Sequence, residues 1–94
     1  MRYNKFEWDD RKAAANRTRH GIGFETARKA FKDPFAVDQP DDRDVHGEDR
    51  FTLIGMADGR LLFVAYTMRE DRIRIISARG AEPYEHRIYH EKSG

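Results

Sequence analysis

The stretch FTLIGMADGRLLFVAYTM, from Phe51 to Met68, decides which fold this chain can adopt. Two apolar arms flank Asp58-Gly59, a dipeptide typical of the tight turn between antiparallel strands. The second arm, LLFVAYTM, is apolar at successive positions, as expected for a central strand that is covered on both faces. The stretch therefore predicts a β-hairpin in the middle of a sheet.

A third strand is predicted directly after this hairpin. Arg69-Glu70-Asp71 has the composition of a turn, and the run RIRIISA then begins at Arg72. Its isoleucines, Ile73, Ile75 and Ile76, supply one apolar face, and arginines point outward from the other face. Together the three strands predict an antiparallel meander.

The first part of the chain predicts a short strand and a helix. Tyr3–Trp8 alternates loosely, and the Asp9-Asp10 pair can cap a helix that spans Arg11–Arg19 and stops before Gly21. The apolar side of this helix consists of the small residues Ala13–Ala15, so the helix is expected to lie close against its neighbours.

A second helix is predicted to start at Gly23–Glu25 and to end at Asp33-Pro34, because the residue before a proline avoids helical geometry. Its apolar stripe consists of Phe24, Ala27, Ala30 and Phe31. Phe35–Val37 predicts a strand, and the acidic segment Gln39–Asp49 predicts a solvated loop. After the meander, Ala81–Pro83 opens a last helix. Its inward-facing residues are predicted to be Tyr84, Ile88 and Tyr89. The order β-α-α-β-β-β-β-α is that of an α+β fold.

Length and composition limit the kind of protein. The 94 residues are enough for one domain, residues 1–94, without room for a second core. Apolar residues make up 38% and charged residues 37%, yet the net charge is only +1, so a phosphate-binding surface has to be local. The absence of cysteine excludes disulfides and thiolate chemistry. No apolar run suits a membrane helix or an export signal, and we expect a cytoplasmic protein without membrane partners.

Arginine is concentrated in and around the meander. The arginines from position 50 to position 79 are Arg50, Arg60, Arg69, Arg72, Arg74 and Arg79. Guanidinium groups suit bidentate contact with phosphate or carboxylate, so the pattern favours a phosphate-binding cleft. Arg69 and Arg72 should meet at one end of the sheet, and Arg50 can approach Arg79 if the strand order permits. The alternative is a set of separate arginines that only solubilise a small sheet.

Cleavage of a phosphodiester needs groups that transfer protons as well as cations. The candidates are His20, His46, Glu48 and Tyr66. Three of them have an ordinary alternative: His20 as a cation at a helix end, Glu48 as a solvated loop residue and Tyr66 as a buried tyrosine. His86 and His90 have the spacing of metal ligands on a helix, but no third ligand accompanies them, so we expect no metal site and no cofactor.

Short motifs along nearly the whole chain resemble those of a known toxin family. In the first half they are FEWD at Phe6–Asp9, Lys12, Asn16, RHG at Arg19–Gly21, FxxA at Phe24–Ala27 and FxD at Phe31–Asp33. In the second half they are EDRF at Glu48–Phe51, IG at Ile54-Gly55, YTxR at Tyr66–Arg69, IRIISAR at Ile73–Arg79 and ExxxY at Glu85–Tyr89. In this order and spacing they resemble the BrnT toxin family, with Arg19 where members usually have lysine.

The resemblance implies a RelE-like α+β fold, with two N-terminal helices and one C-terminal helix packed on a twisted antiparallel sheet. It implies a type II toxin that cuts RNA without a metal, through attack by a 2′-hydroxyl, and so inhibits translation. Its partner would be a BrnA-type antitoxin with a ribbon-helix-helix portion, and DNA would be bound only through the complex. A module that binds nucleic acid or protein without catalysis is the alternative.

The same resemblance assigns roles to individual residues. The cations at the phosphate would be Arg50, Arg69 and Arg79, and the candidates for acid–base catalysis would be Glu48, His20 and Tyr66. Further RNA contacts would come from Lys12, Arg72 and Arg74.

Overall fold

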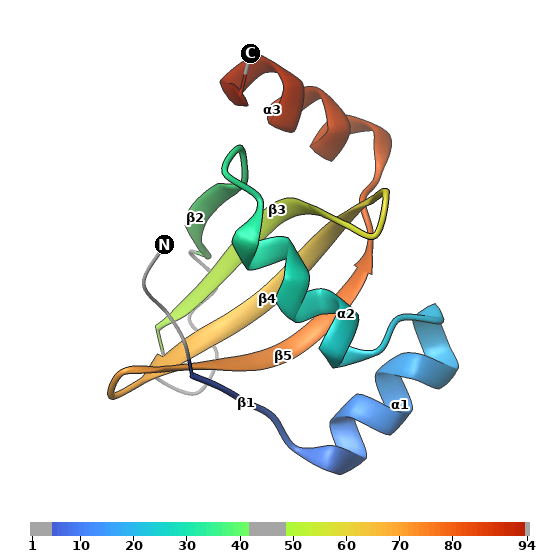
Figure 1. The fold of residues 1–94 in the computed structure, drawn as a ribbon, viewed down its shortest axis with the longest axis vertical. Coiled ribbons are helices and arrows are strands. Elements are labelled where there is room, and N and C mark those ends of the chain that lie inside the picture. Colours follow the sequence, from blue (N-terminus) through green and yellow to red (C-terminus); the bar gives the residue numbers. More distant parts are fainter. Residues whose placement is uncertain (1–4, 42–48, 94) are drawn as a thin grey trace.

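The computed structural model of the chain describes residues 5–41 and 49–93. In chain order its elements are β1 (Phe6–Glu7), α1 (Asp10–His20), α2 (Phe24–Lys29), the 3-10 turn η1 (Ala30–Lys32), β2 (Val37–Asp41), β3 (Arg50–Ala57), β4 (Arg60–Arg69), β5 (Arg72–Gly80) and α3 (Pro83–Ser93). The strands form one sheet in the order β1-β5-β4-β3-β2 (Figure 1). The predicted α+β fold, with two N-terminal helices and one C-terminal helix, is confirmed, and it is compatible with a RelE-like arrangement.

The sheet is mixed rather than purely antiparallel. The strands from β2 to β5 pair antiparallel, whereas β1 lies parallel to β5, with Phe6 opposite Ile73. Parallel neighbours need a long connection between them. Here the chain passes through both N-terminal helices and the whole meander before β5 reaches β1. The local sequence pattern could not show this pairing, because β1 is the first strand along the chain and β5 is the last.

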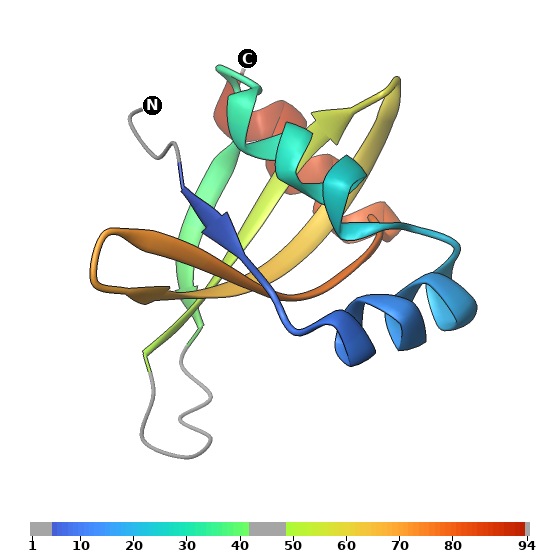
Figure 2. The same cartoon turned by 60° about the horizontal axis from the view of Figure 1, so that its bottom comes forward.

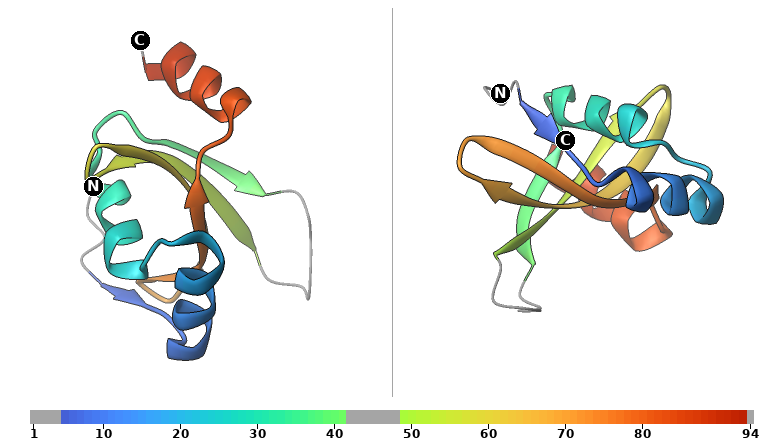
Figure 3. Two further views of the ribbon diagram at one scale, coloured as in Figure 1. Left: turned by 90° about the vertical axis from the view of Figure 1, so that its right-hand side faces the viewer. Right: turned by 90° about the horizontal axis from the view of Figure 1, so that it is seen from below.

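The predicted hairpin turns are confirmed. Asp58 and Gly59 have φ angles of 52° and 79°, the left-handed pair that lets a two-residue turn follow the twist of the strands. Glu70, in the turn between β4 and β5, also has a positive φ of 59°. Figure 3 shows the strong twist that results across the sheet.

One face of the sheet carries the main hydrophobic core. Alternate residues of β3, β4 and β5 point toward α1 and α2, among them Leu53, Leu62, Val64, Ile73, Ile75 and Ala78. The predicted stripe of α2 and η1 packs onto them, and all four of its residues are buried. A Cβ atom at Gly55 would lie 2.6 Å from the carbonyl oxygen of Ala30, so this glycine allows η1 to approach β3. We call this side of the sheet the core face.

The contacts of α1 differ from the prediction. Asp9 caps the helix and Gly21 ends it with a φ of 72°, as expected, but Ala14 and Ala15 are exposed. The buried residue of α1 is Asn16, which is 6% exposed. Its Nδ2 donates to the carbonyl oxygens of Ile22 and Ala78, and its Oδ1 accepts from the backbone N–H of Ala78. One amide therefore ties α1 to β5.

The strand predicted at Phe35–Val37 is displaced. Phe35 is 58% exposed, and β2 spans Val37–Asp41, inside the segment predicted to be an irregular loop. Proline and aspartate disfavour strands, but β2 is at the edge of the sheet, where Pro40 can be accommodated. The strand forms because it pairs with β3, from Val37 opposite Ile54 to Asp41 opposite Arg50, although its own residues have a low propensity for strands.

The last helix, α3, packs on the side of the sheet opposite α2 (Figure 2). Tyr89 is buried and Ile88 half-buried, as predicted, but Tyr84 is 49% exposed. The residue of α3 that is fully buried is Glu85. Both polar and apolar contacts therefore hold α3 on the sheet. No helix in residues 5–41 or 49–93 is both long and apolar enough to cross a membrane.

Candidate functional site

Five of the six arginines in and around the meander point to one side of the sheet, and Arg60 is the exception, because it pairs with Ala57 of the core face. Strand register pairs Arg50 with Thr67, Thr67 with Arg74, and Arg69 with Arg72. Directly paired residues share a face, so these arginines lie on the side opposite the core face. Arg79 is paired with Phe63, which also points to this side. We call this side of the sheet the arginine face.

A β-bulge is the reason that Arg79 belongs to this face. Simple alternation from Arg72 and Arg74 would turn Arg79 toward the core face. In β5, Ile75 pairs with Tyr66 and Ser77 pairs with Ala65, so Ile76 is an extra residue in the ladder. The extra residue reverses the alternation after it. The expectation that three isoleucines share one face is therefore wrong at Ile76, which is half-buried at the bulge.

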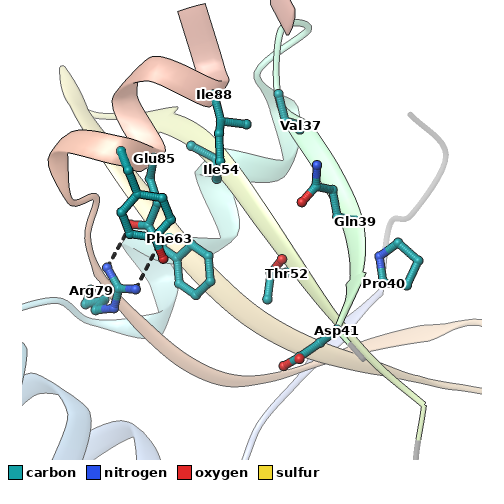
Figure 4. Close-up of a pocket in the computed structure, with 11 residues that line it drawn as sticks. Val37, Gln39, Pro40, Asp41, Thr52, Ile54, Phe63, Arg79, Glu85 and Ile88 are labelled. Atoms are coloured by element: carbon teal, nitrogen blue, oxygen red, sulfur yellow. Dashed lines mark hydrogen bonds and ion pairs between the residues drawn. The ribbon is translucent and has the colours of Figure 1, made fainter. Parts of the chain in front are cut away.

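A band of small side chains crosses the arginine face. It consists of Thr52, Ala65 and Ser77 on neighbouring strands, and Gln39 extends it onto β2. Toward α3 it is bordered by the larger side chains of Ile54, Phe63 and Arg79, and on the other side by Arg50 and Arg74 with Thr67 between them. We call this band the trough. Its β2 end opens into a groove of about 470 Å³ between β2 and α3 (Figure 4).

At the α3 border, Arg79 is held in a buried ion pair. Its Nη1 and Nη2 donate to the two carboxylate oxygens of Glu85 at 2.8 and 2.9 Å. The guanidinium lies over the ring of Phe63, 4.3 Å from the ring centre. Burial alone would raise the pKa of Glu85, but hydrogen bonds from Arg79 and from the backbone N–H of Glu82 lower it. Glu85 therefore stays ionised and fixes α3 to β5.

A second acid, Glu7 of β1, binds two arginines of β5. Its carboxylate accepts from Nη1 of Arg74 at 2.8 Å and from Nη1 of Arg72 at 3.4 Å. The hydrogen bond from Arg74 is the largest cause of the lowered pKa of Glu7. Arg74 and Arg72 are thus partly neutralised, and the parallel strand β1 orients both.

Arg50 differs from these paired arginines. It lies between Asp41 and Thr67 in one row across β2, β3 and β4. Its Nε is buried and has no hydrogen-bond partner within residues 5–41 and 49–93. A buried donor without an acceptor is costly, and such groups often serve a ligand. The row also contains the hydroxyl of Thr67, which donates to the carbonyl oxygen of Asp49 at 2.6 Å.

The arginines share a face without meeting at one point. Arg69 pairs with Arg72 at the far end of β4, six positions from Phe63, the partner of Arg79. At ~3.3 Å per residue this is roughly 20 Å. The strand order also puts β4 between Arg50 and Arg79. The strand order thus does not permit the approach of Arg50 to Arg79, and the arginines form a surface rather than a single cluster.

Tyr66 lies on the other side of the sheet. Its ring is buried in the core face, in edge contact with Phe31 and stacked on Phe51. Its hydroxyl donates to the carboxylate of Asp38 at 2.7 Å. The structure therefore agrees with the ordinary alternative for Tyr66, a buried tyrosine whose hydroxyl lies at the rim of the core. Tyr66 cannot act at a phosphate held on the arginine face.

The remaining predicted residues are dispersed. Lys12 and His20 belong to α1, which packs through Ala13 and Asn16 onto the core face and β5; Lys12 is exposed and His20 half-buried. Glu48 and His46 lie outside the described residues. The structure thus brings together the arginines of β3, β4 and β5, and it separates them from Tyr66 and α1.

Sequence reasoning missed several polar residues of the arginine face. Glu85 and Glu7 orient its arginines, and Gln39, Asp41 and Thr52 line the groove. The motif ExxxY at Glu85–Tyr89 included Glu85, but nothing in it indicated that this carboxylate binds Arg79. The placement of Gln39 and Asp41 on one face of a strand was not visible in the sequence, because proline and aspartate made their segment look irregular.

The family of the chain follows from comparison with known proteins. Residues 8–85 match the model of the family described as the ribonuclease toxin, BrnT, of type II toxin-antitoxin systems. The chain belongs to the BrnT family. The match contains α1, α2, the entire meander and the first turn of α3, so it includes the trough and the contact of Arg79 with Glu85, whereas β1 with Glu7 lies just before it. Among curated proteins no sequence matches the chain. As a BrnT-family member the chain is a ribonuclease toxin with an antitoxin partner.

Proposed function

We propose that this BrnT-family chain, acting as one domain, is a metal-independent endoribonuclease that binds RNA along the trough. The arginine face carries the proposal. It is the one broad side of the sheet that α1 and α2 leave open, and arginines border a floor of small side chains there. An RNA strand needs room for its backbone and cations beside its phosphates, and the trough offers both.

Arg50 is proposed as the main cation at the scissile phosphate. Its buried Nε has no acceptor among the described residues, so a phosphate oxygen would complete its hydrogen bonding. Arg74 lies two strands away in the same row, separated from Arg50 by Thr67. Directly opposed residues on neighbouring strands are ~5 Å apart, so the two guanidinium groups can reach one phosphate from both sides.

The reaction is proposed to be internal attack by the ribose 2′-hydroxyl. The 2′-oxygen forms a bond to phosphorus, and the bond from phosphorus to the 5′-oxygen breaks. A base takes the 2′-proton and an acid gives a proton to the leaving oxygen, so a 2′,3′-cyclic phosphate and a 5′-hydroxyl end result. The arginines stabilise the charge that gathers on the phosphoryl oxygens in the transition state.

Other residues receive different roles. Arg79 is bound by Glu85, so its proposed role is to position α3 and border the trough. Arg69 and Arg72 would bind neighbouring phosphates of the strand. Glu48 stays a candidate for proton transfer, as does His20 with less support, because α1 packs on the core face.

The cellular role follows from the family and remains part of the proposal. RNA cleavage would take place in the cytoplasm and inhibit translation. A BrnA-type antitoxin would silence the toxin, and its ribbon-helix-helix portion would carry the complex to DNA. An acidic or amphipathic antitoxin segment that covers the arginine face would compete directly with RNA.

Cleavage of a labelled RNA by purified protein tests the proposal. Arg50→Ala should lower the cleavage rate by about 10²-fold or more, since one transition-state contact is lost. Arg11→Ala removes the same charge from an exposed position of α1 and should cleave like the parent. Cleavage should persist in EDTA, and the products should carry cyclic phosphate ends.

Three outcomes would contradict separate parts of the proposal. If Arg50→Ala cleaves as fast as Arg11→Ala, the phosphate is not bound in this row. If EDTA abolishes cleavage and Mg²⁺ restores it, metal independence is wrong. If RNA is bound in a salt-sensitive manner without products, the chain is a binding module.

A further inference from the structure

The floor of the trough at its β2 end contains uncharged polar side chains that phosphate binding does not explain. The groove there has a volume of about 470 Å³. Gln39 of β2 and Thr52 of β3 line it, and Figure 4 shows the side chain of Gln39 extending from β2 toward Thr52. On the α3 side of the groove the guanidinium of Arg79 is already bound by Glu85. We therefore expect the part of an RNA that binds here to be a neutral polar group rather than a phosphate.

Gln39 and Thr52 have hydrogen-bonding capacity to offer to a ligand. They are directly opposite each other in the register of β2 and β3, so their Cβ atoms are ~5 Å apart on the same face of the sheet. Both are half-buried, and neither side chain makes a hydrogen bond to a residue of the ranges 5–41 and 49–93. An amide has a donor and an acceptor, and a hydroxyl can act as either. The pair can therefore donate to and accept from one small group at the same time.

A hydroxyl group of the ligand matches this pair. A phosphate only accepts hydrogen bonds, so it would leave the acceptor oxygens of Gln39 and Thr52 unused. An alcohol donates one hydrogen bond and accepts others, as the pair itself does. In an RNA strand the 3′- and 5′-oxygens are esterified, and the free hydroxyl of each ribose is the 2′-hydroxyl. This group is what distinguishes RNA from DNA at a given site.

The shape of the trough favours the sugar over the base at this position. Beyond Thr52 the row continues with Ala65 of β4 and Ser77 of β5. These small side chains allow the backbone of an RNA strand to approach the sheet closely. None of the four residues of the row is aromatic, so its floor has no ring on which a base could stack. A strand that lies on this floor therefore places its riboses against the row.

The position of Arg50 indicates which ribose would be bound. Arg50 and Thr52 are two positions apart on the same face of β3, which corresponds to ~7 Å along the strand. The ribose that attacks carries the scissile phosphate on its 3′-oxygen, and its 2′-hydroxyl has to contact phosphorus. A ribose at Thr52 is farther from a phosphate at Arg50 than such contact allows. It would be the next ribose, which is joined to the same phosphate through its 5′-oxygen.

We propose that Gln39 and Thr52 form a ribose subsite, which binds the 2′-hydroxyl of the nucleotide on the 3′ side of the cleaved bond. The inference rests on the proposed function, because it takes Arg50 as the residue that binds the scissile phosphate. It adds selection of the sugar at the binding step. RNA is then preferred over DNA through a contact that is separate from the attacking hydroxyl.

Mononucleotide binding tests the subsite without any need for cleavage. The 5′-monophosphates AMP and 2′-deoxy-AMP differ only in the 2′-hydroxyl, and neither contains a phosphodiester that can be cut. Both are titrated into ¹⁵N-labelled protein, and backbone amide shifts are followed by NMR. AMP should bind about tenfold more tightly, because 2′-deoxy-AMP loses the hydrogen bonds to both side chains. The shifts should centre on Gln39, Arg50 and Thr52. Equal affinities, or shifts centred elsewhere, would overturn the subsite.

Variants identify the groups that bind the hydroxyl. Thr52→Val keeps the shape of the side chain without its hydroxyl, and Gln39→Met keeps the length without the amide. Each should reduce the preference for AMP to about threefold or less, whereas Thr52→Ser should retain it. Thr18→Val makes the same chemical change at an exposed position of α1 and should bind both nucleotides like the parent. A parent-like NMR spectrum of each variant establishes that it folds. A full preference for AMP in both Thr52→Val and Gln39→Met would contradict the assignment.

Cleavage of a modified RNA separates the subsite from the proposed function. An RNA that lacks only the 2′-hydroxyl on the 3′ side of a mapped cut should be cleaved with about tenfold lower kcat/KM. In Thr52→Val the modified and unmodified RNA should be cleaved almost alike, and an undiminished difference would overturn the subsite. A protein that cuts RNA but binds AMP and 2′-deoxy-AMP equally would also overturn it and leave the proposed function standing. A protein that prefers AMP but cuts no RNA would instead contradict the proposed function and leave the subsite standing.

Discussion

The two faces of the sheet are stabilised in different ways. The core face is closed by apolar side chains of α1, α2 and η1, and one buried amide, that of Asn16, ties the helix to the strands. The arginine face is covered only in part, and two carboxylate contacts hold α3 there: Glu85 with Arg79 of β5, and Asp33, which follows η1, with Tyr89. Hydrophobic burial depends little on pH or salt, whereas the contacts of carboxylates depend on both. The fold therefore keeps its stability on one side and leaves the other available for charged ligands.

A pair of truncations in β3 tests how much each face contributes to the free energy of unfolding. Leu53 is 1% exposed on the core face, and Met56 is 40% exposed on the other. Leu53→Ala should lower the free energy of unfolding by about 2–5 kcal/mol, because it leaves a cavity. Met56→Ala should cost less than about 1 kcal/mol. Urea unfolding followed by circular dichroism measures both, and similar losses would show that the faces contribute equally.

Removal of one buried charge should have the next largest effect. Glu85→Gln leaves the guanidinium of Arg79 without its anion in a site where the Glu85 side chain is fully buried. Breaking a buried pair costs ~3–5 kcal/mol, and because water reaches Arg79 we expect about 2 kcal/mol. Glu91→Gln, on an exposed part of α3, should change stability by less than about 0.5 kcal/mol. Equal stability of the two variants would mean that α3 is held by its apolar contacts alone.

Local chemistry predicted the elements of this fold well. Asp58-Gly59 specified the hairpin, the Asp9-Asp10 pair and Gly21 bounded α1, and Pro83 opened α3. These features depend on a few adjacent residues, so the sequence displays them directly. The strand β2 was misplaced, because its formation depends on β3, which comes later in the chain.

The site was predictable only in part, for a related reason. The sequence showed which arginines exist, but one extra residue, Ile76, decides which face Arg79 occupies. The partners of the arginines were also hidden. Glu85 is on a helix and Arg79 on a strand, and Glu7 is far from Arg74 in sequence, so no periodicity links them. Charged residues are usually exposed, and nothing local marked Glu85 as buried.

The dependence of the unfolding free energy on acid pH tests the contribution of the buried and paired carboxylates. The pKa values of Glu85, Glu7 and Asp33 are lowered from ordinary values of 4.5 for glutamate and 3.8 for aspartate. A lowered pKa stabilises the fold above the ordinary value, and this contribution is lost as the pH falls through the lowered value. Stability should therefore decline below about pH 5. The decline should be shallower in Glu85→Gln than in Glu91→Gln, and parallel curves would contradict the assignment.

The smallest expected effect concerns the second attachment of α3. The hydroxyl of Tyr89 donates to Oδ2 of Asp33 at 2.6 Å, and the same oxygen accepts from the backbone N–H of Met56. Tyr89→Phe keeps the ring and leaves Asp33 with its backbone donors, so we expect a loss of about 1 kcal/mol at neutral pH.

The effect of Tyr89→Phe on the free energy of unfolding should depend on alkaline pH, which a mere loss of packing would not produce. Burial and then the bond to Asp33 raise the pKa of Tyr89 from 10.0 to about 12. A raised pKa stabilises the fold below the ordinary value, and the contribution disappears as the pH rises through the higher one. The difference in unfolding free energy between the parent and Tyr89→Phe should therefore shrink between about pH 10 and pH 12. A constant difference across this range would mean that the Tyr89 hydroxyl is not held by Asp33, and the attachment of α3 would then rest on Glu85.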